Sequence, residues 1–478
     1  MRKRFEDQFS FDCTPIDEVS IPTKTRSCMA NLMASLQHIY VNGQWNEQIC
    51  SLLSDKILAG KKQTGRSGMS LWQIFVLAQV RLGLNISYDE LTYRANYDWL
   101  LRGILGVLPT DFSSGQSFER QVIYDNIKLL SDDELHQINE VIVQIGHGVF
   151  KKKAEAGLAC KTDSFVVETD THFPTDYNLL WDSGRKCIDV AVKLNVSGWR
   201  KHHNWQAKLK KLMRRVGKAS TGGGANKAER VRQAASAYVN KARRLEAKVA
   251  ETLVSFQSQT SAEAARVEQL MYYRKMLAKH IDLVARRLLA GEQIPHHEKV
   301  FSIFQPYTEM IKKGKTNPNV EIGKNLAITT DQYHLIIDWQ IAEGQTDNQM
   351  TMDIAWRLVA NYRLSSWSVD RGFSDKAHKA ALADHIDQLI MPKKGRRSRA
   401  EVAVESARPF QRLNNAHNAV ESNINELEHR GLNRCPDRTR ANFDRYIGLA
   451  ITAYNLCRIG RQLRKQYQGL AEVGRQAA

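Results

Sequence analysis

The chain has 478 residues, and its 69 Lys and Arg against 51 Asp and Glu give a formal net charge of +18. A hydrophobic fraction of 42% is enough to bury a core, which excludes global disorder. No uninterrupted apolar run reaches the roughly 18 residues of a membrane-spanning helix. The N-terminus lacks the apolar stretch of about 7–15 residues found in export signals. We therefore expect a cytoplasmic protein of about three domains, at roughly 150 residues per domain.

The cysteines give no sign of a metal site or a disulfide framework. They are seven in number, widely separated, and never spaced as CxxC: Cys13, Cys28, Cys50, Cys160, Cys187, Cys435 and Cys457. The expectation is reduced thiols in a cytoplasmic protein.

The positive charge is concentrated in two places. Residues 201–250 hold fourteen Lys and Arg but only two Glu, a surplus of 14 − 2 = +12. A second cluster, Lys393 to Arg399, lies in a loop that follows Pro392. Such clusters are the electrostatic signature of nucleic-acid binding, because each neutralised phosphate releases condensed counterions. A solvated helix face is the alternative for either cluster alone, and their occurrence together favours DNA or RNA.

Residues 1–155 read as a helical N-terminal domain. Apolar residues recur at helical spacing over 71–80, Gly83 and Asn85 break the pattern, and Ser87 to Glu90 is a capping box for the next helix. This helix, turn and helix outline predicts a helix-turn-helix that binds DNA, with dimerisation or packing as the alternative. A further capping box at residues 131–134 opens a helix that ends near Phe150.

From residue 156 the pattern changes to alternating strands and helices. Residues 162–169 predict a strand, and residues up to about 291 are helix-forming, apart from a flexible linker at Thr221 to Gly224. Further strands are expected at 300–304, 320–328, 333–341, 364–369 and 389–391, and helices at 350–360, 401–430 and 438–464. The expected class is an α/β core (156–175 plus 298–435) with a basic helical insertion (176–297), preceded by the all-α N-terminal domain and followed by a C-terminal helix and tail (436–478).

Three carboxylates occupy positions that the pattern defines. Asp163 lies in the first strand, Asp370 follows a later strand just before a capped helix, and Glu421 borders the packed side of a helix. Functional groups of α/β folds gather at such strand ends. Hard divalent cations prefer carboxylate oxygens, and two ions can stabilise both oxygens of a phosphodiester displacement. Two strand carboxylates and one helix carboxylate would suffice for such a site.

Several blocks of the chain resemble DDE transposases of bacterial insertion sequences, most closely the type placed in the not-classified (ISNCY) group. The matching blocks run in the family order from the helical N-terminal region to Asn455-Leu456: residues 163–169, 172–176, 179–180, 300–304, 308–315, 370–373 and 420–432.

The resemblance implies an RNase H-like catalytic core in which Asp163, Asp370 and Glu421 hold two Mg²⁺ ions, with Mn²⁺ as a substitute. Asp170 is the rival for the first position and Glu428 for the third. The implied activity is binding of element ends, Mg²⁺-dependent cleavage and strand transfer, with double-stranded DNA (terminal inverted repeats and target) as the partner, a homodimer on DNA, and no membrane. The implied setting is the bacterial cytoplasm.

The basic residues expected to contact DNA lie in three groups. They are Lys208, Lys210, Lys211, Arg214 and Arg215 in the insertion, Lys313 and Lys315 in a loop, and Arg371, Lys393, Lys394, Arg396 and Arg397 near the second carboxylate. A salt bridge that holds the turn is the alternative role for Arg371. His417, one turn before Glu421, is expected either to touch DNA or orient a water, or to be an ordinary helix-surface histidine.

Two other functions fit the same sequence. An RNase H-like nuclease without strand transfer would keep the fold and the carboxylates. A non-catalytic DNA-binding protein would use only the basic helices, and its binding would fall steeply with salt without any metal-dependent chemistry.

Overall fold

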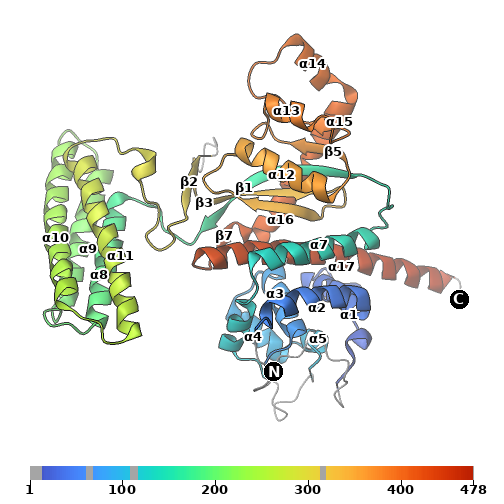
Figure 1. The fold of residues 1–478 in the computed structure, drawn as a ribbon, viewed down its shortest axis with the longest axis horizontal. Helices are drawn as coiled ribbons and strands as arrows, with labels where there is room; N and C mark the ends of the chain where they lie inside the picture. Colours follow the sequence, from blue (N-terminus) through green and yellow to red (C-terminus); the bar gives the residue numbers. More distant parts are fainter. Residues whose placement is uncertain (1–12, 61–67, 108–116, 313–318, 477–478) are drawn as a thin grey trace. The chain divides into compact units, whose positions relative to one another are not determined.

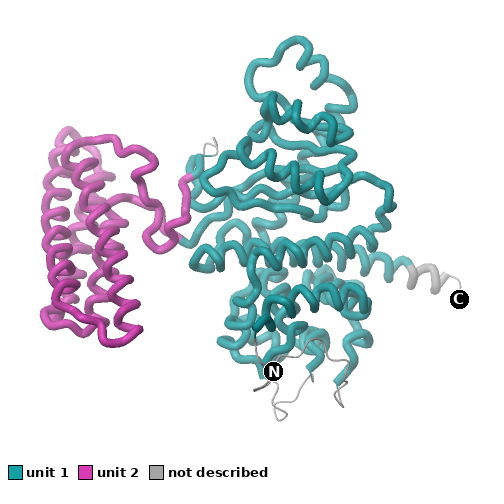
Figure 2. Tube along the Cα trace, in the orientation of Figure 1, with its two compact units in different colours: residues 1–170, 311–478 teal, residues 171–310 magenta. Residues whose placement is uncertain are grey.

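The computed structural model describes residues 13–60, 68–107, 117–312 and 319–476. The chain divides into two compact units, residues 1–170 with 311–478 and residues 171–310 (Figures 1 and 2). The second unit contains the whole predicted insertion, 176–297, with short flanking segments. The N-terminal helices, the sheet and the C-terminal helix, which the sequence assigned to separate domains, together form the first unit.

The N-terminal helices reproduce the expected helix–turn–helix outline. The described helices before the sheet are α1 (Cys28–Val41), α2 (Gly43–Ile57), α3 (Leu71–Gly83), α4 (Tyr88–Tyr97), α5 (Trp99–Ile104), α6 (Arg120–Ile127) and α7 (Asp132–Val149). A capping box between Ser70 and Gln73 starts α3, which is buried along almost its whole length. The only arginine of α4, Arg94, pairs with Glu90 at 2.7 Å. The exposed side of α4 therefore offers little positive charge to a DNA groove.

The last helix, α17 (Arg440–Gln476), lies in the centre of the first unit rather than at its margin. It packs against α1, α3 and α7. The Nδ2 of Asn455 donates to the Oδ1 of Asn139 and to the backbone oxygen of Ile336, both at 2.8 Å. Because this amide links α17, α7 and a sheet strand, the C-terminal helix holds the N-terminal helices on the sheet.

The contact between α1 and α17 depends on a glycine. A Cβ atom at Gly460 would overlap the backbone oxygen of Asn31 in α1. Gly460→Ala should therefore push the two helices apart and lower the free energy of unfolding by about 3 kcal/mol, the upper range for overpacking. The matched control is Gly148→Ala in α7, where a Cβ meets nothing within 4 Å. That change should stabilise by up to about 1 kcal/mol through helix propensity. Equal denaturant midpoints for the two variants would contradict this packing.

The first unit is built on a mixed seven-stranded sheet with β1 at its centre. The strands are β1 (Leu158–Thr169), β2 (Glu309–Lys312), β3 (Val320–Thr330), β4 (Ile336–Ile341), β5 (Leu364–Val369), β6 (Leu389–Ile390) and β7 (Arg434–Cys435). Their order is β2-β3-β1-β5-β6, with β4 also paired to β3 and β7 to β1. β3 runs antiparallel to β1, whereas β5 and β7 run parallel to it.

Helices cover both faces of this sheet (Figure 1). After β4 come α12 (Asp347–Asn361) and, after β5, α13 (Lys376–Leu382); the segments after β6 are α14 (Arg399–Ser406), α15 (Arg408–His417) and α16 (Ala419–Leu427). The core beneath α12 includes Cys160, Ala327 and Trp367, one from each of three neighbouring strands. Since side chains alternate along a strand, the residues next to these point to the opposite face.

Two expectations from the sequence are wrong. Residues 300–304 form no strand: the Oγ of Ser302 accepts from the backbone N–H groups of Phe304 and Gln305, which competes with ladder pairing. Ile303 is instead buried in the core of the second unit. The single helix expected at 401–430 is three helices. Pro409 near the start of α15 lacks the N–H that a continuous helix needs, which separates α14 from α15. A second break, at Asn418, separates α15 from α16.

The second unit contains four long helices, α8 (Asp176–Lys193), α9 (His202–Thr221), α10 (Lys227–Ser255) and α11 (Ser261–Val284). Their shared core includes one fully buried leucine from each helix: Leu180, Leu209, Leu245 and Leu277. Both α9 and α11 pack on α8 and α10, which places α9 and α11 at diagonal corners of the bundle. The predicted linker at residues 221–224 joins α9 to α10. In either unit, no described helix is both long and apolar enough to cross a membrane.

Candidate active site

The strand register places Asp163 beside Asp370. In the parallel pair β1 and β5, Thr162 lies opposite Val369, the last residue of β5. The residue that follows each of these in the chain is one of the predicted carboxylates, so Asp163 and Asp370 lie on adjacent chains that are roughly 4.8 Å apart. The sequence could not show this, because it does not give the register between two strands separated by about two hundred residues.

Both carboxylates belong to the face of the sheet that α15 and α16 cover. Ser368, two residues before Asp370, lies opposite Lys161, two residues before Asp163. The Oγ of Ser368 is 3.1 Å from the Nδ1 of His417 at the end of α15. Since side chains two residues apart point to the same face, Asp163 and Asp370 face the junction between α15 and α16.

Glu421 stands on this junction, in the first turn of α16. Val420 and Leu427 are buried and fix the helix on the sheet, whereas Glu421 is exposed. The buried Asn423 adds polar anchors, because its Oδ1 is 3.2 Å from both the Nδ1 of His334 and the hydroxyl of Tyr454. The helix that carries Glu421 is thus held from the β3–β4 turn and from α17.

His417 lies among the candidate carboxylates. Burial lowers its pKa, although the negative charges of Asp370 and Glu421 oppose that shift and Lys161 adds to it. Its Nε2 is buried, and no described residue gives it a hydrogen-bond partner. The imidazole therefore belongs to the carboxylate neighbourhood and is not the exposed histidine of a helix surface.

The two rival carboxylates occupy other places. Asp170 is seven residues beyond Asp163, or roughly 23 Å along an extended strand, and pairs with Arg434 at 2.7 Å. Glu428 follows α16 in a π-helical turn, seven residues or about 10 Å along the helix axis from Glu421. The register favours Asp163 over Asp170 as the partner of Asp370. The charges of Asp370 and Glu421 both act on His417, which favours Glu421 over Glu428.

A carboxylate that the sequence did not suggest supports the neighbourhood of Asp163 and Asp370 from the other face of the sheet. The Oδ1 of Asp347, the first residue of α12, accepts from the Oγ of Ser164 and the Nδ2 of Asn325, both at 2.8 Å. A Cβ atom at Gly372 would lie 2.9 Å from its Oδ2. Asp347 therefore braces β1, β3 and the turn after Asp370. The capping box of Thr346 and Gln349 is the signal that could have located it.

The basic residues of α9 form an exposed surface. Lys210, Lys211, Arg214, Arg215 and Lys218 line a shallow depression of about 520 Å³. None of these residues, nor Lys208, has an ion-pair partner within 4.0 Å among the described residues. We call these six basic residues, Lys208 included, the α9 surface. Its charge is not neutralised within the bundle, so it is available to a polyanion.

The second basic cluster starts beside Asp370, and two of its five basic residues are paired with carboxylates. Ser368 pairs with Ile390 in β6, so the register brings Pro392 level with Asp370. Within the loop that follows, Lys393 pairs with Glu401 at 2.7 Å and Arg397 with Glu405 at 3.0 Å. Lys394, Arg396 and, next to Asp370, Arg371 are exposed. Lys313 and Lys315 lie outside the described residues.

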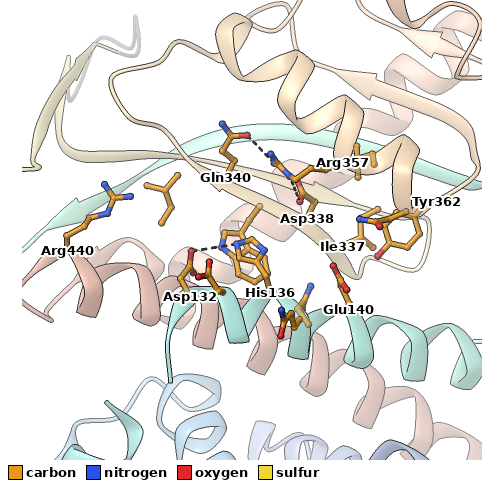
Figure 3. Close-up of a pocket in the computed structure, with 16 residues that line it drawn as sticks. Asp132, His136, Glu140, Ile337, Asp338, Gln340, Arg357, Tyr362 and Arg440 are labelled. Atoms are coloured by element: carbon orange, nitrogen blue, oxygen red, sulfur yellow. Dashed lines mark hydrogen bonds and ion pairs between the residues drawn. The ribbon is translucent and has the colours of Figure 1, made fainter. Parts of the chain in front are cut away.

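A separate cavity of about 620 Å³ lies at β4, between α7 and α12 (Figure 3). The ring of His136 stacks on Trp339 with centroids 3.5 Å apart, and burial lowers the pKa of His136 to about 4. Burial, together with Asp444, raises the pKa of Asp132 to about 7. The strands β3 and β1 separate β4 from β5, so this cavity does not include the candidate carboxylates.

An ion pair across this cavity should matter for stability. The Nε and Nη2 of Arg357 donate to the two carboxylate oxygens of Asp338 at 3.0 and 2.8 Å. Arg357→Met would leave a mostly buried carboxylate uncompensated. Because Arg357 itself is partly exposed, the change should cost about 3 kcal/mol of unfolding free energy at pH 8, the lower end for a broken buried pair. Burial already raises the pKa of Asp338, so protonation should relieve part of the loss at pH 5. Denaturant titrations should also show that adding Asp338→Asn recovers stability; a larger loss in that double variant would contradict the role of the pair.

Asp163, Asp370 and Glu421 together suit a hard divalent cation, since all three groups are carboxylates. In the described part of the chain, no three or more His, Cys, Asp or Glu side chains are gathered closely enough to hold a metal ion. Asp370 and Glu421 are exposed, so their rotamers are free to change. Comparisons with protein-family models, with curated proteins and with solved structures found no match to this chain.

Proposed function

We propose that the chain is a DDE-type transposase of the bacterial insertion-sequence class. It would act on DNA in the cytoplasm, bind both ends of its own mobile element, cut a strand at each end and join the freed 3′-hydroxyl to target DNA. The observation that carries this proposal is the register of β1 and β5. It sets Asp163 beside Asp370 on the face where α16 carries Glu421.

The sheet supports an RNase H-like assignment of the core. A central first strand lies between an antiparallel strand, β3, which continues to β4, and two parallel strands, β5 and β6. The helical unit 171–310 follows β1 directly and returns at β2. This arrangement agrees with the expectation of a catalytic core interrupted after its first strand.

Asp163, Asp370 and Glu421 would hold two Mg²⁺ ions, or Mn²⁺ in their place. Such ions, when bound, stabilise the attacking and leaving oxygens of a phosphodiester displacement. The protein contributes position: hydrogen bonds and apolar contacts fix β1, β5 and α16 beneath the three carboxylates. His417 lies against β5, where its Nδ1 is 3.1 Å from the Oγ of Ser368.

The basic groups would bind the DNA backbone. The α9 surface would contact phosphates, while Arg371, Lys394 and Arg396 would hold the strand at the β5 and β6 ends. These contacts position the duplex without reading its sequence. Because both ends must be cut in concert, we expect two copies of the chain on the DNA.

The proposal is tested with duplexes that carry the DNA flanking the gene, a supercoiled target plasmid and Mg²⁺. The expected products are a nick that leaves a 3′-hydroxyl at each end, and end DNA joined to plasmid. Cleavage without joined products would instead indicate an RNase H-like nuclease. Binding without metal-dependent products would indicate a DNA-binding protein, and either outcome would overturn the transposase assignment.

A further inference from the structure

Two of the free cysteines lie in contact, although they are far apart in the sequence. Cys28 is the first residue of α1 and is partly exposed, whereas Cys457 in α17 is buried. Their Sγ atoms are 2.9 Å apart. A disulfide needs about 2.05 Å, so a movement of less than 1 Å would allow a bond.

The surroundings of Cys28 favour its thiolate form. The Nη1 of Arg430 donates to the Sγ of Cys28 at 3.0 Å, and the thiol of Cys457 is placed to donate as well. The N-terminus of α1 adds positive potential at this residue. The hydrogen bond from Cys457 and the charge of Arg430 outweigh burial and lower the pKa of Cys28 to about 6.

The other cysteines are less accessible or less acidic, and Cys50 is buried. Cys160, Cys187 and Cys435 are buried, and burial raises the pKa of each thiol. Cys13 is partly exposed, but burial of its thiol raises its pKa as well. Oxidation follows thiolate character and access, which singles out Cys28.

We infer that Cys28 and Cys457 form a peroxide-reactive thiol pair, with Cys28 as the attacking sulfur and Cys457 as the resolving one. The Cys28 thiolate attacks hydrogen peroxide: an S–O bond forms, the O–O bond breaks, and hydroxide leaves and is protonated to water. The Cys457 sulfur then attacks the sulfenic sulfur: an S–S bond forms, the S–O bond breaks, and the leaving hydroxide takes the thiol proton. Two thiols and one peroxide thus give one disulfide and two waters.

The disulfide would tie α1 to α17 and remove a hydrogen-bond acceptor of Arg430. Arg430 also pairs with Glu426 of α16 at 2.7 Å. Oxidation therefore changes the contacts at one end of α16 and strengthens the attachment of α17 to the N-terminal helices. This inference does not depend on the proposed function.

The test is treatment of the full-length protein with hydrogen peroxide, followed by alkylation in denaturant and non-reducing peptide mapping. We expect a single cross-linked peptide pair that contains Cys28 and Cys457. The number of free thiols per chain should fall from seven to five. The midpoint of thermal unfolding should rise on oxidation and return with dithiothreitol. A disulfide between other cysteines, or retention of all thiols under conditions that oxidise free cysteine, would overturn the inference.

Single variants separate the two roles. Cys28→Ser should abolish the loss of thiols, and Cys457→Ser should leave a sulfenic acid on Cys28 that dimedone traps. Cys13→Ser is the matched control for a partly exposed cysteine and should react like the unmodified protein. If Cys28→Ser loses two thiols at the original rate, Cys28 is not the attacking sulfur. The mapping of the unmodified chain decides the matter even where a variant folds poorly.

Discussion

Asp370→Asn should lower the rate of strand cleavage by about 10³-fold and leave the affinity for element ends unchanged. Metal ions stabilise several kcal/mol of transition-state charge in such reactions, and about 1.4 kcal/mol corresponds to a factor of ten in rate. An amide keeps the size of the side chain but loses the negative charge that holds the ion. Asp370 is exposed and follows the last residue of β5, so folding should not suffer. Single-turnover cleavage of a labelled end duplex, with a parallel binding titration, measures both quantities.

The rival carboxylates supply matched controls. Asp163→Asn and Glu421→Gln should repeat the loss, whereas Asp170→Asn and Glu428→Gln should cleave within a few-fold of the unmodified protein. The register explains this difference, since Asp170 lies at the far end of β1 and pairs with Arg434. If Asp170→Asn were inactive and Asp163→Asn active, the site would have to be built elsewhere on β1. Retained cleavage in Asp370→Asn would remove that residue from the site.

Neutralising the α9 surface should weaken DNA binding about 10²–10³-fold near physiological salt, and this loss should be similar for different DNA sequences. The variant is Lys210→Gln, Lys211→Gln, Arg214→Gln and Arg215→Gln together. Each phosphate contact contributes about 0.9 to the slope of log K against log salt. Loss of four contacts should therefore make the slope shallower by up to about 3.6. Titrations by fluorescence anisotropy at several salt concentrations measure it directly.

The control for this prediction lies on the diagonal helix of the same bundle. Lys275→Gln and Lys279→Gln in α11 also remove positive charge from the bundle, but at the opposite corner from α9. They should change the salt slope little. If the control changed the slope by half as much as the first variant, in proportion to the two charges it removes, only the total charge would matter. No loss in the first variant would mean that the α9 surface does not contact DNA.

Much of the fold could be predicted because its signals are local. The strand at residues 364–369 is where β5 lies, and the capping box at residues 131–134 does start α7. The basic insertion also falls within one compact unit. Hydrophobic periodicity and helix caps depend on a few neighbouring residues, so the sequence displays them directly.

Features that depend on distant contacts could not be read in this way. The expected strand at residues 300–304 is an apolar run that Ser302 bends into the core of the helical unit. The role of α17 as the central helix depends on partners more than 300 residues away, such as Asn139. For the candidate site, the sequence suggested the three carboxylates, but only the register distinguishes Asp163 from Asp170. Asp347, at the start of α12, was missed because its partners, Ser164 and Asn325, come from two strands that are distant from it or unpaired with it in the sequence pattern.

The most direct test of metal-dependent chemistry at Asp163, Asp370 and Glu421 is a change of metal preference in Asp370→Cys. A thiolate ligand binds Mg²⁺ poorly and accepts softer metals. Cleavage of an end duplex by this variant should be lost in Mg²⁺ and restored at least in part in Mn²⁺, while Asp170→Cys should cleave equally well in both. If Asp370→Cys cleaved in Mg²⁺ as fast as the unmodified protein, Asp370 would not be a metal ligand, and the proposed site would be wrong.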